Sequence, residues 1–477
     1  MRRAALALAL SIPVLARADD AAVRLVGRAL GDTPMLADLR QLTDEIGGRP
    51  TGSPANDRAV DWGVAKFRAA GLEVKTETAP VPQLWLGGAA RAACVKPEPF
   101  ALAVSAAPGS ASALGLEARL VDAGDGTKMS AGARGAIALV GIGEMRSLDD
   151  LFAEYMRTPA LVAAATKAGI VALLLESSHP RDLLYRHPVA FSRALPFPVA
   201  IISREHAARL RRLAAAGEVR VRLDLDNKIG PAFTTRNVVA DLRGREKPDE
   251  IVVLGAHLDS WDLGTGANDN GVNAALVIDV ARGMKALGLT PRRTVRFVLW
   301  NGEEQGLWGS AGYVRAHAAE MDKHVATVTF DIGSGRTLGF FLNGRPELRA
   351  VVDEALRPVA GLGPFAHIDE AVDGTDNFDF LLSGVPNFVA NQDAAPYLPD
   401  YHASSDTFDK VDPREAQANA AIASALVWAL AERAEPPGKR QTRAEVEKLI
   451  RATKLEPQMK AFDQWDDWVA KKRGASK

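Results

Sequence analysis

Alternating apolar strands and amphipathic helices fill the chain after Pro231, and this pattern constrains the fold more than any other feature. Strands that alternate with helices form a parallel sheet with helices on both faces. The chain is therefore predicted to be α/β, with a mostly parallel central sheet flanked by helices. The predicted strands are 237–242, 250–258, 294–301, 325–331 and 385–390, and the predicted helices are 271–287, 310–319, 346–359, 377–383 and 413–433.

Three of these strands end in ionisable side chains. One ends at His257 and Asp259, the next at Glu303 and Glu304, and the third at Asp331. Open parallel sheets bind ligands beyond the carboxyl ends of their strands. We therefore expect these side chains to meet in one crevice, although each alone would be read as a solvated or structural group.

Two loops add further candidates to this edge of the sheet. Asp269 lies between Gly266 and Gly271, where glycines allow the backbone to turn an acidic side chain inward. Tyr401 and His402 lie in the loop 398–407. The set contains two imidazoles and several carboxylates, a donor set that suits zinc, or manganese and cobalt in vitro.

The single cysteine, Cys94, excludes an intrachain disulfide framework and a thiolate metal cluster. Any bound metal must therefore be held by histidines and carboxylates.

The neighbours Glu303 and Glu304 are informative because successive residues point in different directions. One carboxylate can bind a metal while the other faces a bound water. A general base must reach the proton it removes without being occupied as a ligand. Asp259, two residues beyond His257, is placed to orient that imidazole.

In combination these motifs resemble the co-catalytic zinc exopeptidases of the aminopeptidase and glutamate carboxypeptidase type. The segments that carry the resemblance are 257–271, 301–310, Asp331 and 401–402. The segments 236–244 and 257–262 are similar to the plasma glutamate carboxypeptidase (carboxypeptidase Q) subgroup. The similarity covers about residues 30–433.

The resemblance implies a zinc exopeptidase fold and two Zn²⁺ per chain. Asp269 would bridge the two ions. His257 and Asp331 would complete one site, and Glu304 and His402 would complete the other. A pair of zinc ions polarises the scissile carbonyl and activates a shared water.

The resemblance also implies the remaining roles and the substrate. Glu303 would be the general base, and Tyr401 would hydrogen-bond the oxyanion. The substrates would be dipeptides or short peptides, and the chain would form a homodimer. Aminopeptidase, carboxypeptidase and dipeptidase action all stay open at this point.

Two other readings compete with the peptidase. A single-zinc glutaminyl cyclase type keeps a similar acidic cluster and transfers an acyl group within its substrate. A receptor-like relative would be non-catalytic and would lack ligands. Both histidine ligands and the inserted region favour the peptidase, and all five ligand positions are present. The number of metal ions per chain distinguishes the two enzymes.

Residues 86–230 differ from the rest of the chain in composition and are rich in Ala and Gly. We predict an inserted β-rich domain that resembles a protease-associated domain, between the N-terminal part of the peptidase domain (19–85) and its main part (231–435). It contains no cluster of histidines and carboxylates, so it should border the cleft without taking part in the chemistry. Its predicted elements are strands 136–140, 170–175 and 198–202 and a helix at 158–168.

The two ends of the chain differ from the rest. Residues 1–18 have a basic start, an apolar run and a small-residue cleavage pattern at Ala18, as in a signal peptide. The tail 436–477 is highly charged but contains Phe462, Trp465 and Trp468. We predict that it is helical and covers a surface, either of its own chain or of a second copy.

Charge and hydropathy exclude some partners. The chain has 58 Lys and Arg residues and 59 Asp and Glu residues. It therefore has no excess of positive charge that would attract the phosphates of a nucleic acid. After the signal segment no run of 18 apolar residues follows, so no membrane partner is expected for the mature form. A signal peptide with no disulfides indicates a periplasmic or extracellular enzyme.

The other ionisable residues receive structural roles in this interpretation. Asp373 and Asp376 precede a predicted helix and either line the substrate pocket or cap the helix, and capping is the expectation. The remaining histidines are expected not to bind metal: His179, His187, His206, His317, His324 and His367.

Overall fold

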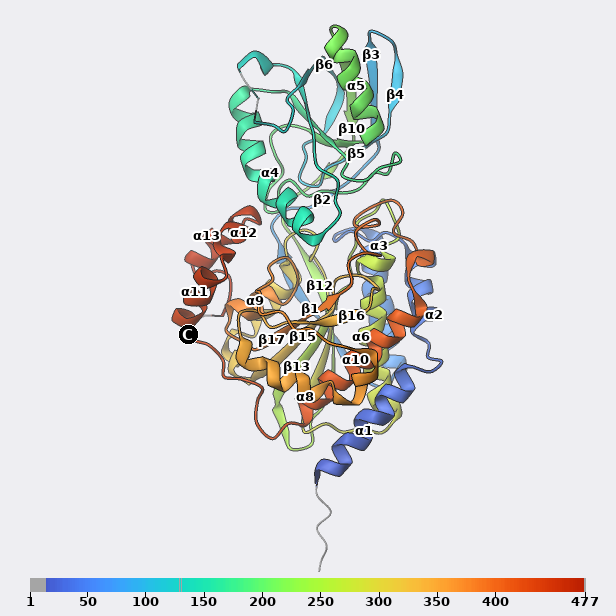
Figure 1. The fold of residues 1–477 in the computed structure, drawn as a ribbon, viewed down its shortest axis with the longest axis vertical. Coiled ribbons are helices and arrows are strands. Elements are labelled where there is room, and N and C mark those ends of the chain that lie inside the picture. The colour runs from blue at the N-terminus through green and yellow to red at the C-terminus, as the bar shows by residue number, and fades with distance from the viewer. Residues whose placement is uncertain (1–13, 128, 130, 476–477) are drawn as a thin grey trace, which may run out of the picture.

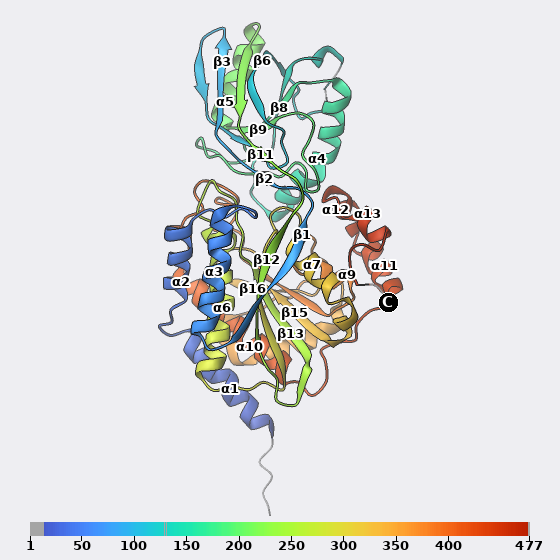
Figure 2. The same cartoon turned by 180° about the vertical axis from the view of Figure 1, so that it is seen from behind.

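The computed structural model describes residues 14–127, 129 and 131–475. Two sheets lie one above the other along the long axis of the molecule (Figures 1 and 2). The lower part contains a seven-stranded sheet with helices on both faces, and the upper part contains an eight-stranded sheet. In the described part of the chain, no helix combines the length and apolar character that crossing a membrane requires.

The central sheet is α/β in type, as predicted, with a parallel middle and antiparallel edges. The four strands β14, β13, β15 and β17 are parallel, whereas β1, β12 and β16 pair antiparallel. In spatial order the strands are β1 (Glu73–Val81), β12 (Phe233–Leu242), β14 (Arg293–Trp300), β13 (Lys247–His257), β15 (His324–Thr329), β17 (Asn387–Gln392) and β16 (Thr337–Phe341).

The antiparallel edge has a simple cause. The chain leaves the sheet at the end of β1 and returns along β12, so Val81 pairs with Phe233 and Glu73 with Asp241. Everything between these strands is inserted at one edge of the sheet. The edge strand β16 was not predicted, because its short segment lies in a glycine-interrupted stretch.

Side chains of the central strands alternate between two cores, as the period of a strand requires. Val252, Leu254 and Ala256 face a core shared with α1 (Val14–Ala29), α2 (Met35–Gln41), α3 (Pro54–Ala69), α6 (Val272–Ala286), α8 (Arg349–Ala355) and α10 (Pro413–Glu432). Ile251 and Val253 face the opposite core, with α7 (Trp308–Ala316) and α9 (Phe378–Leu382).

Helix boundaries differ from the prediction where proline or a π-turn interrupts the pattern. The predicted helix 346–359 is three pieces: a 3-10 turn Pro346–Leu348, α8 and a second 3-10 turn Arg357–Leu362. Pro358 lacks the N–H that a continuous helix needs. The segment 35–46 is likewise divided, into α2 and the π-helical turn Leu42–Ile46.

The eight-stranded sheet is built from residues 90–225, within the range predicted for the insertion. It is connected to the rest by β2 (Trp85–Leu86) and β11 (Lys228–Ile229), which pair antiparallel. Its strands in spatial order are β4 (Phe100–Leu102), β3 (Ala90–Lys96), β10 (Arg220–Leu225), β6 (Ala113–Asp122), β7 (Ile137–Val140), β8 (Ala172–Glu176), β9 (Val199–Ile202) and β5 (Val104–Ala106).

Two helices accompany this sheet, α4 (Leu148–Ala168) and α5 (Arg204–Ala216). Helix α4 begins ten residues before the predicted start at residue 158, because Ser147 caps it and Pro159 is tolerated inside it. Figure 1 shows the first turns of α4 reaching down onto the lower part of the molecule. This extension is what brings the upper part to the functional edge of the central sheet.

The tail is helical, as predicted, and folds onto its own chain. Its helices are α11 (Arg443–Ala452), α12 (Leu455–Ala461) and α13 (Trp465–Val469). Trp468 packs with Phe378 and Leu382 in one apolar cluster, and only 2% of its surface is exposed. The tail aromatics therefore need no second copy to cover them.

The N-terminal prediction falls largely outside the described residues, which begin at Val14. Helix α1 runs from Val14 to Ala29 and passes through the predicted cleavage position. Its core contacts come from Ala21, Leu25 and Val26, all of which follow Ala18. Cleavage there would leave this packing intact, and the signal peptide stays a prediction.

Replacement of Trp468 tests whether the tail is an integral part of the fold. Trp468→Ala should destabilise the folded tail by about 3–5 kcal/mol, because a large buried side chain is lost. Val469→Ala is the matched control, since Val469 is 58% exposed and should cost less than about 0.5 kcal/mol. Native-state hydrogen exchange of α11–α13 measures both effects, and equal protection in the two variants would contradict this packing.

Candidate active site

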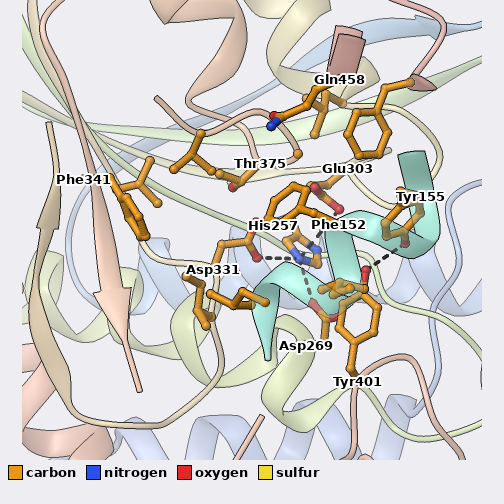
Figure 3. Close-up of a pocket in the computed structure, with 18 of the residues that line it drawn as sticks. Phe152, Tyr155, His257, Asp269, Glu303, Asp331, Phe341, Thr375, Tyr401 and Gln458 are labelled. Atoms are coloured by element: carbon orange, nitrogen blue, oxygen red, sulfur yellow. Dashed lines mark hydrogen bonds and ion pairs between the residues drawn. The ribbon is translucent and has the colours of Figure 1, made fainter. Parts of the chain in front are cut away.

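The predicted strand-end residues do converge at one edge of the central sheet (Figure 3). His257 is the last residue of β13, Glu303 and Glu304 follow β14, and Asp331 follows β15. These strands are adjacent and parallel, so their carboxyl ends meet.

The Asp269 side chain is brought to the same place by a tight turn after β13. Gly266 precedes the π-helical turn Ala267–Gly271 and has φ of 65°. A Cβ atom at Gly266 would lie 2.4 Å from the Ser260 side chain. Glycine is therefore required here by both conformation and space.

A single carboxylate links the two imidazoles. The Asp269 Oδ1 atom lies 3.1 Å from His257 Nε2, and its Oδ2 atom lies 3.2 Å from His402 Nε2. Each imidazole also faces a second carboxylate. Asp331 Oδ1 is 2.9 Å from His257 Nε2, and Glu304 Oε2 is 2.8 Å from His402 Nε2.

These contacts define two overlapping groups of metal-binding atoms. His257, Asp269 and Asp331 form one group, and Asp269, Glu304 and His402 form the other. Within each group the ligand atoms lie within 4.8 Å of one another. Asp269 belongs to both groups, which is the arrangement that a bridging ligand needs.

The residues present fit zinc. His257 Nδ1 donates to the Asp259 carbonyl at 2.9 Å, and His402 Nδ1 donates to the Arg186 carbonyl at 2.8 Å. With its Nδ1 proton donated in this way, each imidazole in its neutral form would present an unprotonated Nε2 to a metal. Glu304 Oε1 and Asp331 Oδ1 are buried without a hydrogen-bond partner. Nitrogen and carboxylate donors of this kind are those that Zn²⁺ prefers.

The role predicted for Asp259 is only partly right. Its main-chain carbonyl, rather than its carboxylate, accepts the hydrogen bond from His257, and its Oδ1 atom is 3.7 Å from Nδ1. The carboxylate instead accepts from the Thr51 hydroxyl at 2.8 Å and from the Glu303 N–H at 3.4 Å. The Asp259 carboxylate thereby links three loops: its own loop after β13, the loop that contains Thr51 and the loop that contains Glu303.

Several carboxyl groups are buried close together at this site, and their pKa values are shifted as a result. Burial, together with Asp331 and Glu304, raises the pKa of the Glu303 carboxyl well above its usual range. Burial also raises the pKa of Glu304 to about 7. Burial alone would lower the pKa of His402, but Glu304 and Asp269 outweigh it and raise the pKa to about 10. Bound cations would relieve this excess of negative charge.

Tyr401 lines the site but bonds away from the ligand groups. Its hydroxyl is 2.8 Å from the Tyr155 hydroxyl of α4 (Figure 3). Its ring stacks on His402, with the ring centroids 3.7 Å apart. The tyrosine that contacts a ligand candidate is Tyr397, whose hydroxyl donates to Asp269 Oδ2 at 3.1 Å. Sequence reasoning missed Tyr397. The predicted oxyanion contact of Tyr401 stays a prediction.

Two further residues hold the loop that carries Asp269. Buried Arg49 donates to the carbonyls of Leu258 at 2.5 Å and Gly266 at 2.9 Å. The Asp406 carboxylate accepts from the N–H groups of residues 267, 268 and 269 at 2.7–3.1 Å. Arg49 was not among the predicted site residues, because a single arginine beside Pro50 carries no periodic signal.

A cavity of about 420 Å³ opens onto the ligand groups. Its walls come from three parts of the chain: the central sheet, helix α4 with Phe152, and the tail helix α12 with Gln458 (Figure 3). The lining is largely apolar, and among the described residues it contains no lysine or arginine. The predicted insertion thus borders the cavity, as expected, and the tail does so as well.

The prediction that Asp373 and Asp376 cap α9 is wrong. The residue at the helix start is Asn377, and no side chain caps the first turn. Both carboxyl groups are buried, and none of their oxygens has a hydrogen-bond partner. Burial raises the pKa of Asp373 to about 7 and that of Asp376 well above its usual range.

Within the described residues, the remaining histidines lie outside both ligand groups, as expected. His187 contacts the Thr158 hydroxyl, His179 the Leu398 carbonyl, and His324 the Tyr313 hydroxyl. These contacts are structural. The three other histidines are His206, His317 and His367, which bond to Ser203, Glu77 and the N–H of Phe340.

Comparisons with known proteins find similarity to peptidases. Residues 237–427 match Peptidase family M28. The chain is 29% identical over 411 residues to carboxypeptidase Q of Rattus norvegicus and 28% identical over 413 residues to that of Homo sapiens. Each alignment covers 83% of this chain and 85% of the relative. The resemblance to zinc exopeptidases is thereby confirmed.

Solved structures show the same fold. The peptidase M28 precursor of Shewanella amazonensis superposes with a TM-score of 0.82 at 29% identity, covering 89% of this chain and 99% of that one. A zinc aminopeptidase of Bacillus subtilis superposes with a TM-score of 0.67 at 21% identity, covering 85% and 97%. At 21% identity, the similarity to the Bacillus subtilis enzyme establishes only a shared fold.

The buried carboxyl of Asp373 predicts a pH-dependent stability effect. The folded protein keeps this proton up to about pH 7, whereas the unfolded chain releases it near pH 3.8. Asp373 therefore costs stability increasingly as the pH rises through this window. Relative to the wild type, Asp373→Asn should gain up to about 3 kcal/mol of unfolding free energy between about pH 5 and pH 8.

Urea denaturation at the two pH values measures this difference. Asp412→Asn is the matched control, because Asp412 does cap a helix, accepting from the N–H of Arg414 at 2.8 Å. Asparagine caps equally well, so a change below about 0.5 kcal/mol is expected. A pH-independent effect of Asp373→Asn would restore the capping role.

Proposed function

We propose that this zinc-dependent metallo-exopeptidase, whose residues 237–427 match Peptidase family M28, hydrolyses dipeptides and other short peptides at a two-zinc centre. The observation that carries the proposal is the pair of ligand groups that share Asp269. In this proposal His257 and Asp331 complete one zinc site, and Glu304 and His402 complete the other.

The zinc pair, when bound, polarises the scissile carbonyl and makes a water molecule acidic enough to attack it. The chain contributes the geometry. The carbonyls of Asp259 and Arg186 fix the two imidazoles, and the Tyr397 hydroxyl fixes the orientation of Asp269. Such supporting contacts keep ligands in place and tune their basicity.

Glu303 is assigned as the general base. It belongs to neither ligand group, yet its Oε2 atom lies 4.0 Å from His257 Nε2 and its side chain lines the cavity. It can therefore accept the proton of the attacking water and pass it to the leaving amine. Its neighbour Glu304 is in contact with His402 and is assigned as a ligand.

The cavity supports small substrates. A volume of about 420 Å³ suits a ligand the size of a short peptide, and α4 and α12 close two of its sides. The lining contains Asp149 and Glu370 but, among the described residues, no cation that could clamp a substrate carboxylate. We infer that the enzyme recognises the free amino end of the peptide.

Three further assignments belong to this proposal. Residues 1–18 act as a signal peptide that directs the enzyme to the periplasm or the extracellular space. Residues 86–230 form a protease-associated domain, a reading that the separate eight-stranded sheet supports. The mature chain forms a homodimer, as the resemblance to the carboxypeptidase Q subgroup implies.

A panel of dipeptides with free and blocked ends tests the substrate assignment. Dipeptides and dipeptide amides should be hydrolysed, whereas N-acetylated dipeptides should be hydrolysed at least about 100-fold more slowly. Activity should also fall with peptide length, because the cavity is closed on two sides. Chelation should abolish activity and zinc should restore it. Hydrolysis of acetylated but not amidated dipeptides would instead show recognition of the carboxyl end.

Glu303→Gln and Glu304→Gln should fail in different ways. Glu303→Gln should keep two zinc ions per chain and lose about 10²–10⁴-fold in kcat, because only the base is removed. Glu304→Gln should lose zinc affinity by at least about tenfold at one site. Elemental analysis and kinetics on the same samples separate the outcomes. The reverse pattern would exchange the two roles, and one zinc per wild-type chain would favour the single-zinc cyclase type.

A further inference from the structure

His402 has an unusual backbone for a residue that must be placed accurately. Its φ is 53°, in the left-handed region that residues other than glycine rarely adopt. Such a conformation persists only when the surrounding structure holds it. His402 also lies in a loop beyond β17, so no strand of the central sheet fixes its position.

The support comes from the insertion. The Arg186 N–H donates to the His402 carbonyl at 3.0 Å, and the Arg186 carbonyl accepts from His402 Nδ1 at 2.8 Å. Tyr185 pairs antiparallel with Ala403, and the Ser404 N–H donates to the Leu184 carbonyl at 3.1 Å. Residues 184–186 and 402–404 thus form a short ladder between the upper and lower parts of the molecule.

The Arg186 side chain locks this ladder in place. It is 3% exposed, and its guanidinium binds both carboxylate oxygens of Asp262 at 2.9 and 3.0 Å. It also donates to the Ala106 carbonyl at the end of β5 at 2.6 Å. Asp262 belongs to the loop that runs from His257 to Asp269. Arg186 therefore joins the insertion, this loop and His402.

The other histidine has no such dependence. His257 is the last residue of β13, and the carbonyl that fixes its ring belongs to Asp259, two residues further along the same segment. Asp331 follows β15, a strand at the middle of the central sheet. One ligand group is thus held by the central sheet, and the other depends on the insertion.

We propose that Arg186 is a positioning residue, through which the insertion completes the zinc site formed by Glu304 and His402. The inference rests on the two-zinc centre proposed above. It refines the expectation that the insertion only covers the cleft, since one of the two zinc sites then requires it. Loss of a supporting contact of this kind typically lowers metal affinity by about 10–100-fold.

Zinc titration of the full-length protein tests the proposal. The wild type should bind two zinc ions. Arg186→Ala should bind one with unchanged affinity and the other about 10–100-fold more weakly. Arg186→Lys should lie between them, because it keeps the charge but not the paired contact with Asp262. Circular dichroism confirms that each variant is folded.

Arg211→Ala is the matched control. Arg211 also forms an ion pair within the insertion, with Glu176 at 2.5 Å, but it contacts neither the ladder nor the site. It should keep both affinities. Two unchanged affinities in Arg186→Ala would overturn the inference alone. Fewer than two zinc ions in the wild type would overturn the two-zinc proposal first, and this inference with it.

Hydrogen exchange of the unmodified protein provides a test without any substitution. Because coupling is reciprocal, zinc that binds His402 must also stabilise the ladder. The amides of Arg186 and Ser404 should exchange more slowly with zinc than after chelation. The amides of β3 and β4, at the far edge of the upper sheet, should not change. Equal exchange at Arg186 in both states would overturn the proposal.

Discussion

The crowding of buried carboxyl groups around two imidazoles is the constraint on which the rest of this structure depends. Asp269, Asp331, Glu303 and Glu304 line one end of the cavity, and burial together with neighbouring carboxylates raises the pKa values of Asp331, Glu303 and Glu304. Contacts with other parts of the chain must therefore hold these carboxyl groups in place. The buried guanidinium of Arg49 and the carboxylate of Asp406 do this by binding the main chain of the Asp269 loop.

Much of the site could be predicted from the sequence, because it depends on local order. A strand places its last residue at the edge of the sheet, so His257 and Asp331 followed from the strand pattern alone. Adjacent Glu303 and Glu304 could be given different roles because neighbours point apart. The central α/β sheet followed from the same alternation. Its antiparallel edges did not, since one results from where the insertion leaves the chain and the other, β16, is a short strand in a glycine-interrupted stretch.

What could not be predicted depends on contacts between distant segments. Whether Asp259 uses its carbonyl or its carboxylate is decided by Thr51, 208 positions away. Asp373 was expected to cap a helix, but the C-terminal tail buries it. No local sequence pattern predicts a contact with the tail. Tyr397 and Arg49 were missed for the same reason: each is a single residue in a loop whose partner lies elsewhere in the chain.

The cavity walls have a consequence for how activity is inferred between relatives. The ligand groups and Glu303 lie within residues 237–427, which match the peptidase family. Phe152, Phe191 and Phe462, which line the same cavity, lie outside that range. Part of the cavity wall is thus encoded outside the stretch that carries the ligand groups, although Phe341 and Ile368 of that stretch line the cavity too. Evolution can exchange the walls and leave the catalytic residues untouched, so a relative that shares every ligand can still prefer a different peptide.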